Sequence, residues 1–151
     1  VEGGDADFKM NPPLRSREDV QSLVEALASR LIDVIATDHA PHALDEKSVE
    51  FDAAPFGIVG LETSLGLSLK LVQDGLLAIS DLITRMSTAP GRIIGRGGTL
   101  SVGAEADITI IDPVQEWTVD ASKFLSKSRN TPFDKWKLKG KAVRTIVGGR
   151  L

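Results

Sequence analysis

The chain of 151 residues is 42% hydrophobic and 26% charged, which is the balance of a globular protein. The net charge of −3 argues against a nucleic-acid-binding surface, and the lack of cysteine excludes disulfides and thiolate metal sites. No apolar run approaches the about 20 residues of a membrane helix, so no membrane partner is expected.

The first part of the chain is predicted to form a strand, a helix and a second strand. Residues 8–10 form a short strand that stops at the prolines that follow, because proline cannot donate to a ladder. Ser16 is the expected N-cap of a helix whose apolar residues recur at helical spacing as far as Leu31. The apolar run 32–37 predicts a buried strand, and this order favours a parallel βαβ unit.

The end of the second strand carries the strongest functional signal. Asp38 follows the apolar run directly, and the only two histidines of the chain, His39 and His42, come within four positions. A (β/α)₈ barrel presents catalytic groups in this way. Asp38 could bind a metal or act as a general base, but it could also cap the following turn, and the local sequence leaves both open. His42 is the candidate for ligand contact, whereas His39 is expected to support the site through a hydrogen bond or to be exposed.

The rest of the chain divides into a helical and a β-rich part. A long loop over 38–60 precedes three helices: one ends before Gly75, one begins near Ser80, and the last has Pro90 at its first position and stops at Gly95.

Short strands follow the glycines at 97–98, where the composition changes. They are predicted at 106–111, 116–119 and 142–147, with a break at Asp112-Pro113 and a hairpin turn at 148–149. The alternating lysines of 135–141 indicate the exposed side of a strand. The predicted domains are therefore 1–97 and 98–151.

The Asp38 motif cannot form a metal site by itself. Catalytic zinc usually takes three protein ligands, mostly histidine, plus water. Residues 1–97 hold at most two βα units, whereas a complete barrel runs to about 250 residues. Further ligands and the rest of the barrel are therefore expected on polypeptide outside this chain.

Several ordered motifs across the chain resemble class I dihydroorotase. They are Lys-Met-Asn-Pro-Pro-Leu-Arg at 9–15, Ile-Ala-Thr-Asp-His-Ala-Pro-His at 35–42, Pro-Phe-Gly-Ile-Val-Gly-Leu-Glu-Thr at 55–63, Asn-Thr-Pro-Phe at 130–133, and 143–149. The Asp-His-Ala-Pro-His string distinguishes the chain from hydantoinases and allantoinases. The family's His-x-His metal motif, its later histidine ligands and its bridging carboxylate are absent from these residues.

The resemblance implies the C-terminal portion of a metal-dependent amidohydrolase of α/β class. Residues 1–97 would be the last βα units of an incomplete (β/α)₈ TIM barrel, and 98–151 strands of a small β-sandwich. The full-length parent would catalyse the reversible, zinc-dependent hydrolysis of L-dihydroorotate to N-carbamoyl-L-aspartate in pyrimidine biosynthesis. Two zinc ions per active site, a cytoplasmic location and a homo-oligomer are implied, and the segment alone is expected to be inactive.

The resemblance also implies roles for individual residues. Asp38 would be the catalytic aspartate and a zinc ligand, which takes a proton from the attacking water and returns it to the departing nitrogen. His42 and Asn11 would bind substrate, with His42 at the substrate carboxylate. Phe56 and Gly57 would meet the pyrimidine ring through backbone groups.

An alternative is a non-catalytic dihydroorotase-like chain that acts as a structural partner of aspartate transcarbamoylase. The presence of Asp38, His42 and Asn11 favours the enzyme, because a scaffold has no physical need for these three side chains. A complete small binding protein is the least favoured interpretation, because two βα units leave a barrel unclosed.

Overall fold

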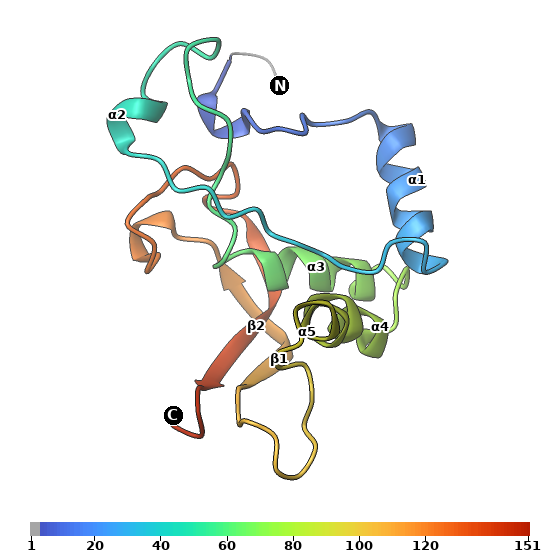
Figure 1. The fold of residues 1–151 in the computed structure, drawn as a ribbon. Helices are drawn as coiled ribbons and strands as arrows, with labels where there is room; N and C mark the ends of the chain where they lie inside the picture. The colour runs from blue at the N-terminus through green and yellow to red at the C-terminus, as the bar shows by residue number, and fades with distance from the viewer. Residues whose placement is uncertain (1–3) are drawn as a thin grey trace. The chain divides into compact units, whose positions relative to one another are not determined.

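A computed structural model describes residues 4–151 (Figure 1). The chain forms two compact units, each assembled from three segments that are separate in the sequence. The first unit combines the residues up to Val20 with Thr37–Ser64 and Thr118–Lys137, and the second combines Gln21–Ala36, Leu65–Trp117 and Leu138–Leu151. All candidate site residues belong to the first unit. The division at 97–98 follows chain order and stays a prediction.

Helix α1, Arg17–Ala28, begins where the sequence predicts. The Ser16 hydroxyl accepts a hydrogen bond from the N–H of Asp19 at 3.1 Å, and the Asp19 carboxylate accepts one from the N–H of Ser16 at 3.3 Å. This reciprocal capping satisfies two N–H groups at the start of the helix. The predicted apolar stripe is not covered, since Val20 and Leu23 are half exposed and no residue of α1 is buried.

Two predicted strands of the N-terminal part are wrong. In place of a strand at 8–10, Ala6–Phe8 form a 3₁₀ turn, because the Asp5 carboxylate accepts the N–H of Asp7 at 2.9 Å and caps it. The run 32–37 has no ladder either. The nearest pairing is a single parallel bridge between His39 and Ile58. A strand needs hydrogen-bonded neighbours, and apolar composition alone does not supply them.

The predicted long loop contains a short helix, α2, at Leu44–Lys47. The Glu46 carboxylate accepts the N–H of Ala43 at 2.8 Å, which stabilises the start of this single turn. The 38–60 segment is therefore more ordered than the sequence indicates.

The three predicted helices of the middle part are confirmed. Helix α3 spans Ser64–Gln73 and is followed by Gly75 in the left-handed conformation, with φ of 72°. Helix α4, Ile79–Ile83, continues through a π-helical turn, Thr84–Thr88, into α5, Ala89–Ile94. Pro90 lies in the first turn of α5 and Gly95 ends it, as predicted.

The C-terminal part forms a hairpin of two strands, β1 at Ile108–Thr118 and β2 at Lys137–Ile146, that run in opposite directions (Figure 1). The predicted break at Asp112-Pro113 is wrong, because β1 continues through it. Among residues 4–151 the sheet has only these two strands, so each has a free edge where proline is tolerated. A bridge between Val147 and Arg150 confirms the predicted turn at 148–149.

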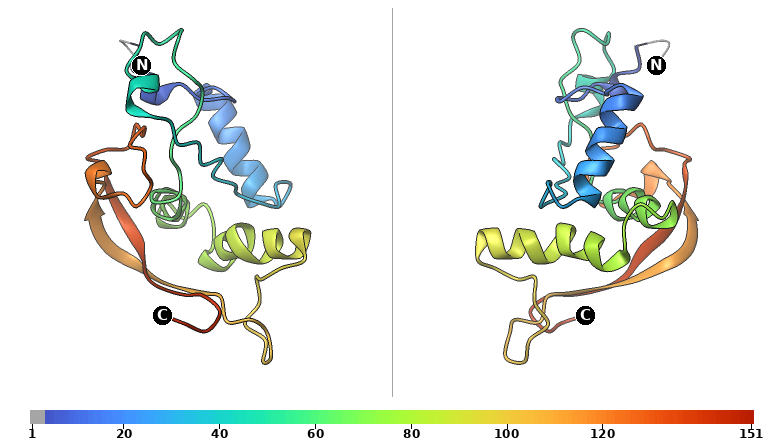
Figure 2. Two further views of the ribbon diagram at one scale, coloured as in Figure 1. Left: turned by 60° about the vertical axis from the view of Figure 1, so that its left-hand side comes forward. Right: turned by 90° about the vertical axis from the view of Figure 1, so that its right-hand side faces the viewer.

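The views in Figure 2 show that the two strands form one long curved ribbon. In the second unit α3 packs on this ribbon: the Gln73 amide donates to the Lys139 carbonyl at 2.8 Å, and Leu69 and Leu138 are buried. Lys137, Lys139 and Lys141 are exposed, which confirms the predicted exposed side of a strand.

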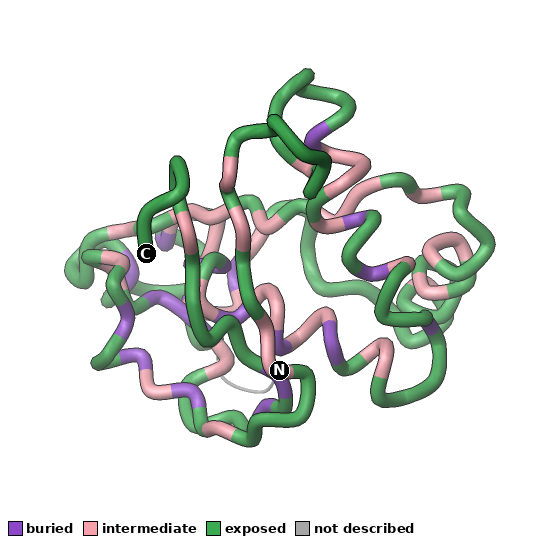
Figure 3. The backbone as a smooth tube through the Cα atoms, turned by 90° about the horizontal axis from the view of Figure 1, so that it is seen from below, coloured by how far each residue is buried: buried purple, intermediate pink, exposed green. Residues whose placement is uncertain are grey.

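Buried residues occur in short stretches along the chain (Figure 3). In the first unit many of them are polar: Lys9, Lys47, Thr63, Asn130 and Thr131. Lys9, Lys47 and Asn130 use their buried polar groups in hydrogen bonds that hold segments of this unit together, whereas the buried hydroxyl of Thr63 has no hydrogen-bond partner among residues 4–151. No helix within residues 4–151 is long and apolar enough to span a bilayer.

Candidate functional site

The loop that carries Asp38 and the loop that carries Phe56 and Gly57 are joined by backbone pairing. The N–H of Ala40 donates to the Ile58 carbonyl at 2.9 Å, next to the bridge between His39 and Ile58. The His39 ring nitrogen Nδ1 accepts the N–H of Gly60 at 3.0 Å. His39 thus supports the loop that leads into α3 through a hydrogen bond, which is one of the two alternatives expected for it.

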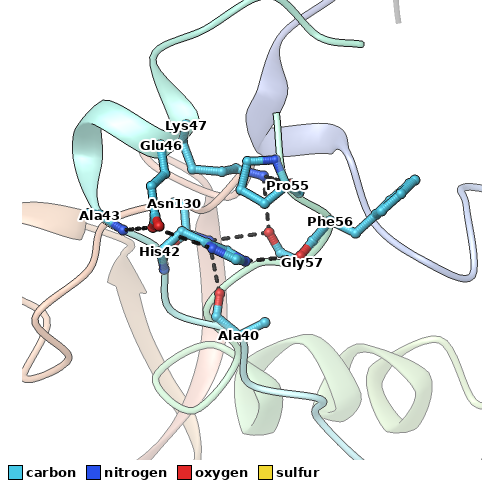
Figure 4. Close-up of polar contacts among 9 residues, drawn as sticks. All are labelled: Ala40, His42, Ala43, Glu46, Lys47, Pro55, Phe56, Gly57 and Asn130. Atoms are coloured by element: carbon cyan, nitrogen blue, oxygen red, sulfur yellow. Dashed lines mark hydrogen bonds and ion pairs between the residues drawn. The ribbon is translucent and has the colours of Figure 1, made fainter. Parts of the chain in front are cut away.

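His42 follows Asp38 on the same segment, and its ring contacts Phe56, one of the predicted substrate residues (Figure 4). Its ring nitrogen Nε2 lies 2.9 Å from the Phe56 carbonyl oxygen, and a carbonyl can only accept, so Nε2 carries the proton. The other nitrogen, Nδ1, lies 3.6 Å from the Glu46 carboxylate. The backbone N–H of His42 donates to Oδ1 of Asn130 at 3.3 Å. The imidazole is therefore oriented by the Phe56 carbonyl, and the backbone of His42 is held by Asn130, whereas 3.6 Å is too long for a hydrogen bond to Glu46.

Gly57 has a conformation and surroundings that exclude a side chain. Its φ is 117°, and a Cβ built on it would lie 2.5 Å from the Cβ of Ala40. Its N–H donates to the Lys9 carbonyl at 2.9 Å, and its carbonyl accepts from Nζ of Lys47 at 3.1 Å and Nδ2 of Asn130 at 3.2 Å. Both polar groups of Gly57 are thus used within the chain. Of the four backbone groups at 56–57, only the N–H of Phe56 makes no hydrogen bond among residues 4–151.

Two buried lysines hold the 51–57 loop, and the sequence analysis missed both. Lys9 and Lys47 are 9% and 7% exposed. Nζ of Lys9 donates to the carbonyls of Phe51 at 2.8 Å and Asp52 at 2.9 Å, and it lies 4.8 Å from the centroid of the Phe56 ring. Nζ of Lys47 donates to the carbonyl of Pro55 at 3.0 Å as well as to that of Gly57.

The charge balance around Lys47 involves one neighbouring carboxyl. Burial lowers the pKa of Lys47, and the negative charge of Asp7 opposes this shift. Burial, and then the charge of Asp5, raise the pKa of Asp7, which Lys47 in turn opposes. Nothing in a single sequence distinguishes these lysines from solvated ones, because their partners are backbone carbonyls.

Asp38 and Asn11 are exposed, and within residues 4–151 neither side chain makes a hydrogen bond or an ion pair. The Asp38 carboxylate therefore caps no turn there, and φ of Asp38 is 41°, in the sparsely populated left-handed region. The structure thus brings His42, Phe56 and Gly57 into contact, and leaves Asp38 and Asn11 without polar contacts to them.

A carboxylate such as that of Asp38 is a suitable zinc ligand, but the described residues do not complete a site. Among residues 4–151 no group of three or more histidine, cysteine, aspartate or glutamate side chains could hold a metal ion.

Comparison with known proteins assigns the family. The model of the amidohydrolase family matches residues 10–151. The chain belongs to the amidohydrolase family. Among curated members, it is 57% identical to the dihydroorotase of Citrifermentans bemidjiense and 55% identical to that of Geobacter metallireducens, in each case over 100% of this chain and 36% of the relative. The resemblance to dihydroorotases is thus confirmed, and the chain spans about a third of the length of these relatives.

Solved structures of other amidohydrolases are similar to this chain in fold. The L-hydantoinase (dihydropyrimidinase) of Arthrobacter aurescens is 36% identical, with a TM-score of 0.88 over 96% of this chain and 35% of that one. The D-hydantoinase (dihydropyrimidinase) of a Thermus species is 28% identical, with a TM-score of 0.85 over 96% of this chain and 33% of that one. The helices and the two-stranded sheet are therefore part of a larger amidohydrolase fold.

Proposed function

We propose that the full-length protein is a dihydroorotase, which hydrolyses L-dihydroorotate reversibly to N-carbamoyl-L-aspartate in pyrimidine biosynthesis. The observation that carries this proposal is the Asp38 carboxylate. It is exposed and without partners among residues 4–151, in a chain more than half identical along its whole length to proteins named dihydroorotase. A carboxylate kept free of internal partners is available for chemistry.

For the whole protein we propose the architecture that the resemblance implies. Residues 1–97 would be the last βα units of a (β/α)₈ barrel, and residues 98–151 a segment of a β-sandwich. Asp38 would ligate a zinc ion in a site of two zinc ions whose other ligands lie outside this chain, and the two ions would supply polarisation of the amide carbonyl and activation of water. A cytoplasmic location belongs to the same proposal.

Asp38 would carry the proton during the reaction. Hydrolysis of the ring amide requires that the attacking water lose a proton and that the departing nitrogen gain one. A single carboxylate can take the first proton and deliver it to the nitrogen, so the side chain returns to its starting state. The exposure of Asp38 supports this role, because substrate and water can reach the carboxylate.

The substrate would be held by His42, Asn11 and the 56–57 backbone. Nε2 of His42 now lies on the Phe56 carbonyl, so donation to a substrate carboxylate through Nε2 would exchange one oxygen acceptor for another. The N–H of Phe56 is the backbone group best suited to meet a carbonyl of the pyrimidine ring, because it has no partner among residues 4–151. The Gly57 groups would serve to fix the loop.

We further propose that copies of the full-length protein associate into a homo-oligomer. Association with aspartate transcarbamoylase is a second proposal. No observation favours a purely structural partner over the enzyme, because the predicted catalytic carboxylate is present and accessible.

The test is the Asp38→Asn variant of the full-length protein, with Asp33→Asn as a matched control. Asp33 is also an exposed carboxylate, five positions earlier on the same segment. Asp38→Asn should lower kcat for dihydroorotate by about 10²–10⁴-fold. After metal has been removed from both proteins, its unfolding midpoint should equal that of the wild type, because the side chain makes no hydrogen bond or ion pair among residues 4–151. Asp33→Asn should keep activity. Near-normal kcat in Asp38→Asn would refute the assigned role.

A further inference from the structure

The buried side chain of Asn130 connects two segments that are far from it in the sequence (Figure 4). Its Nδ2 donates to the carbonyl oxygens of Ala40 at 3.0 Å and Gly57 at 3.2 Å. Its Oδ1 accepts the N–H of His42 at 3.3 Å, and its backbone carbonyl accepts the N–H of Val59 at 3.0 Å. Asn130 is only 5% exposed, so water cannot readily replace these bonds.

Only one orientation of the Asn130 amide satisfies these surroundings. The two hydrogens of its NH₂ group face two carbonyl oxygens, and its oxygen faces an N–H. A flipped amide would oppose acceptor to acceptor and donor to donor. Aspartate would supply only acceptors, alanine no polar group, and serine a single hydroxyl. Asparagine is thus matched to the site by chemistry as well as by size.

We propose that Asn130 is a positioning residue for the substrate-binding groups. It holds the segment of His42 against the segment of Phe56 and Gly57, and so fixes the imidazole where Nε2 meets the Phe56 carbonyl. This inference rests on the proposed function, since it takes His42 and Phe56 to bind substrate. Asn130 itself acts through them, because both its donors and its oxygen are already used within the chain.

The neighbouring Thr131 provides a matched control. It is 4% exposed, and its hydroxyl accepts only the N–H of Phe133, at 3.4 Å. Among residues 4–151 its side chain makes no hydrogen bond to the His42 or Gly57 segments. Thr131→Val keeps the shape and removes a buried polar contact, so it reports the effect of destabilisation alone.

The experiment compares the wild-type full-length protein with Asn130→Ala, Asn130→Asp, Asn130→Ser and Thr131→Val. The measurements are kcat and KM for dihydroorotate per folded protein, the unfolding midpoint, and crystal structures. Asn130→Ala and Asn130→Asp should raise KM about tenfold or more, because the His42 ring and the Phe56 backbone are no longer held in fixed positions relative to each other. Asn130→Ser, which keeps one donor, should give a smaller increase and remains available if the other variants fail to fold. Thr131→Val should keep KM within about twofold, even with a lower midpoint, because partial unfolding reduces active enzyme without changing KM.

An Asn130→Ala or Asn130→Ser enzyme with wild-type KM and an unmoved His42 ring would overturn the inference. The crystal structures test it even if the wild-type protein turns over no dihydroorotate, a result that would refute the proposed function separately. In that case, displacement of the His42 ring from the Phe56 carbonyl in the Asn130 variants, but not in Thr131→Val, would support the positioning role. An unmoved ring would again overturn it.

Discussion

Replacement of Gly57 by alanine is the most direct test of how the two loops of the candidate site fit together. The added Cβ would lie 2.5 Å from the Cβ of Ala40, whereas non-bonded carbon atoms prefer about 3.5–4.0 Å. The same Cβ would lie 3.5 Å from Nε2 of His42, which is an ordinary contact. The clash is therefore with the Cβ of Ala40, which has no rotatable bond of its own and can move away only if the backbone of the 40–42 segment moves.

The expected cost has two parts. A φ of 117° is strained for any residue with a Cβ, at about 1–3 kcal/mol, and forcing the neighbouring loop to move costs about another 1–3 kcal/mol. Gly57→Ala should therefore lower the free energy of unfolding by about 2–6 kcal/mol. Movement of the 40–42 segment would also displace His42, so KM should rise in the same variant.

Two further variants separate these parts. Gly75 also has a positive φ, of 72°, but no atom lies within 4 Å of a Cβ placed there, so Gly75→Ala should cost only about 1–2 kcal/mol. Ala40→Gly removes the atom with which the new Cβ collides. The free energy of unfolding of the double variant Ala40→Gly/Gly57→Ala should therefore be about 1–3 kcal/mol higher than the sum of the two single effects gives. Urea unfolding of the full-length proteins measures it.

Two results would refute the predicted contact between Gly57 and Ala40. One is that Gly57→Ala is no less stable than Gly75→Ala, and the other is that adding Ala40→Gly to Gly57→Ala recovers none of the lost free energy of unfolding. The first result would mean that the loops are not in close contact, and the second that strain at Gly57 arises elsewhere.

Two other predictions concern charged groups of the first unit. Lys47→Met keeps the aliphatic stem but leaves the Pro55 carbonyl without its donor, so it should lower the free energy of unfolding by about 1–3 kcal/mol in urea titrations. An unchanged free energy would contradict the role of Lys47 in holding the 51–57 loop. The hydrogen bond from Ser122, and then Lys123, lower the pKa of the exposed Asp120 from 3.8 to about 2. Because the folded-state pKa lies below the unfolded value, the stabilisation is complete above about pH 4 and is lost as the pH falls towards about 2. The difference in unfolding midpoint between wild type and Asp120→Asn should shrink over this range, and a constant difference would refute the charge effect.

The parts of the fold that the sequence predicts are those determined within a few residues. Ser16 caps α1 through the N–H of Asp19, and glycine stops α3 and α5 because the left-handed conformation costs it little. The wrong predictions concern strands, whose formation depends on hydrogen-bonded neighbours elsewhere in the chain. The run 32–37 has strand composition but no ladder, and β1 continues past Pro113, since a two-stranded ribbon has a free edge at which a missing N–H costs nothing.

The candidate site divides in the same way. Asp38, His39 and His42 stand out because they follow an apolar run at close spacing. Asn130 is predictable only as part of a motif, because its bonds to His42 and Gly57 cross 88 and 73 positions of the chain. The roles of Lys9 and Lys47 leave no trace in the sequence pattern, because a backbone carbonyl can serve as acceptor whatever its side chain.

The composition of the buried groups explains why a few polar residues determine the conformation of this unit. Its buried apolar residues are Ala6, Ala54 and Ala121 together with the larger Val59, Val119 and Phe124. Within the 51–57 loop the only buried residue is Ala54, whose methyl group contributes little transfer free energy, at about 0.8 kcal/mol per buried CH₂ group. A carbonyl that loses its buried donor costs about 1–3 kcal/mol, which is more than one such methyl group supplies. The buried amide and ammonium donors therefore outweigh the small apolar contacts in deciding where the 51–57 loop lies. Substitutions of Asn130 or Lys47 should then affect the position of His42 and Phe56 more than apolar substitutions of similar size in the same unit.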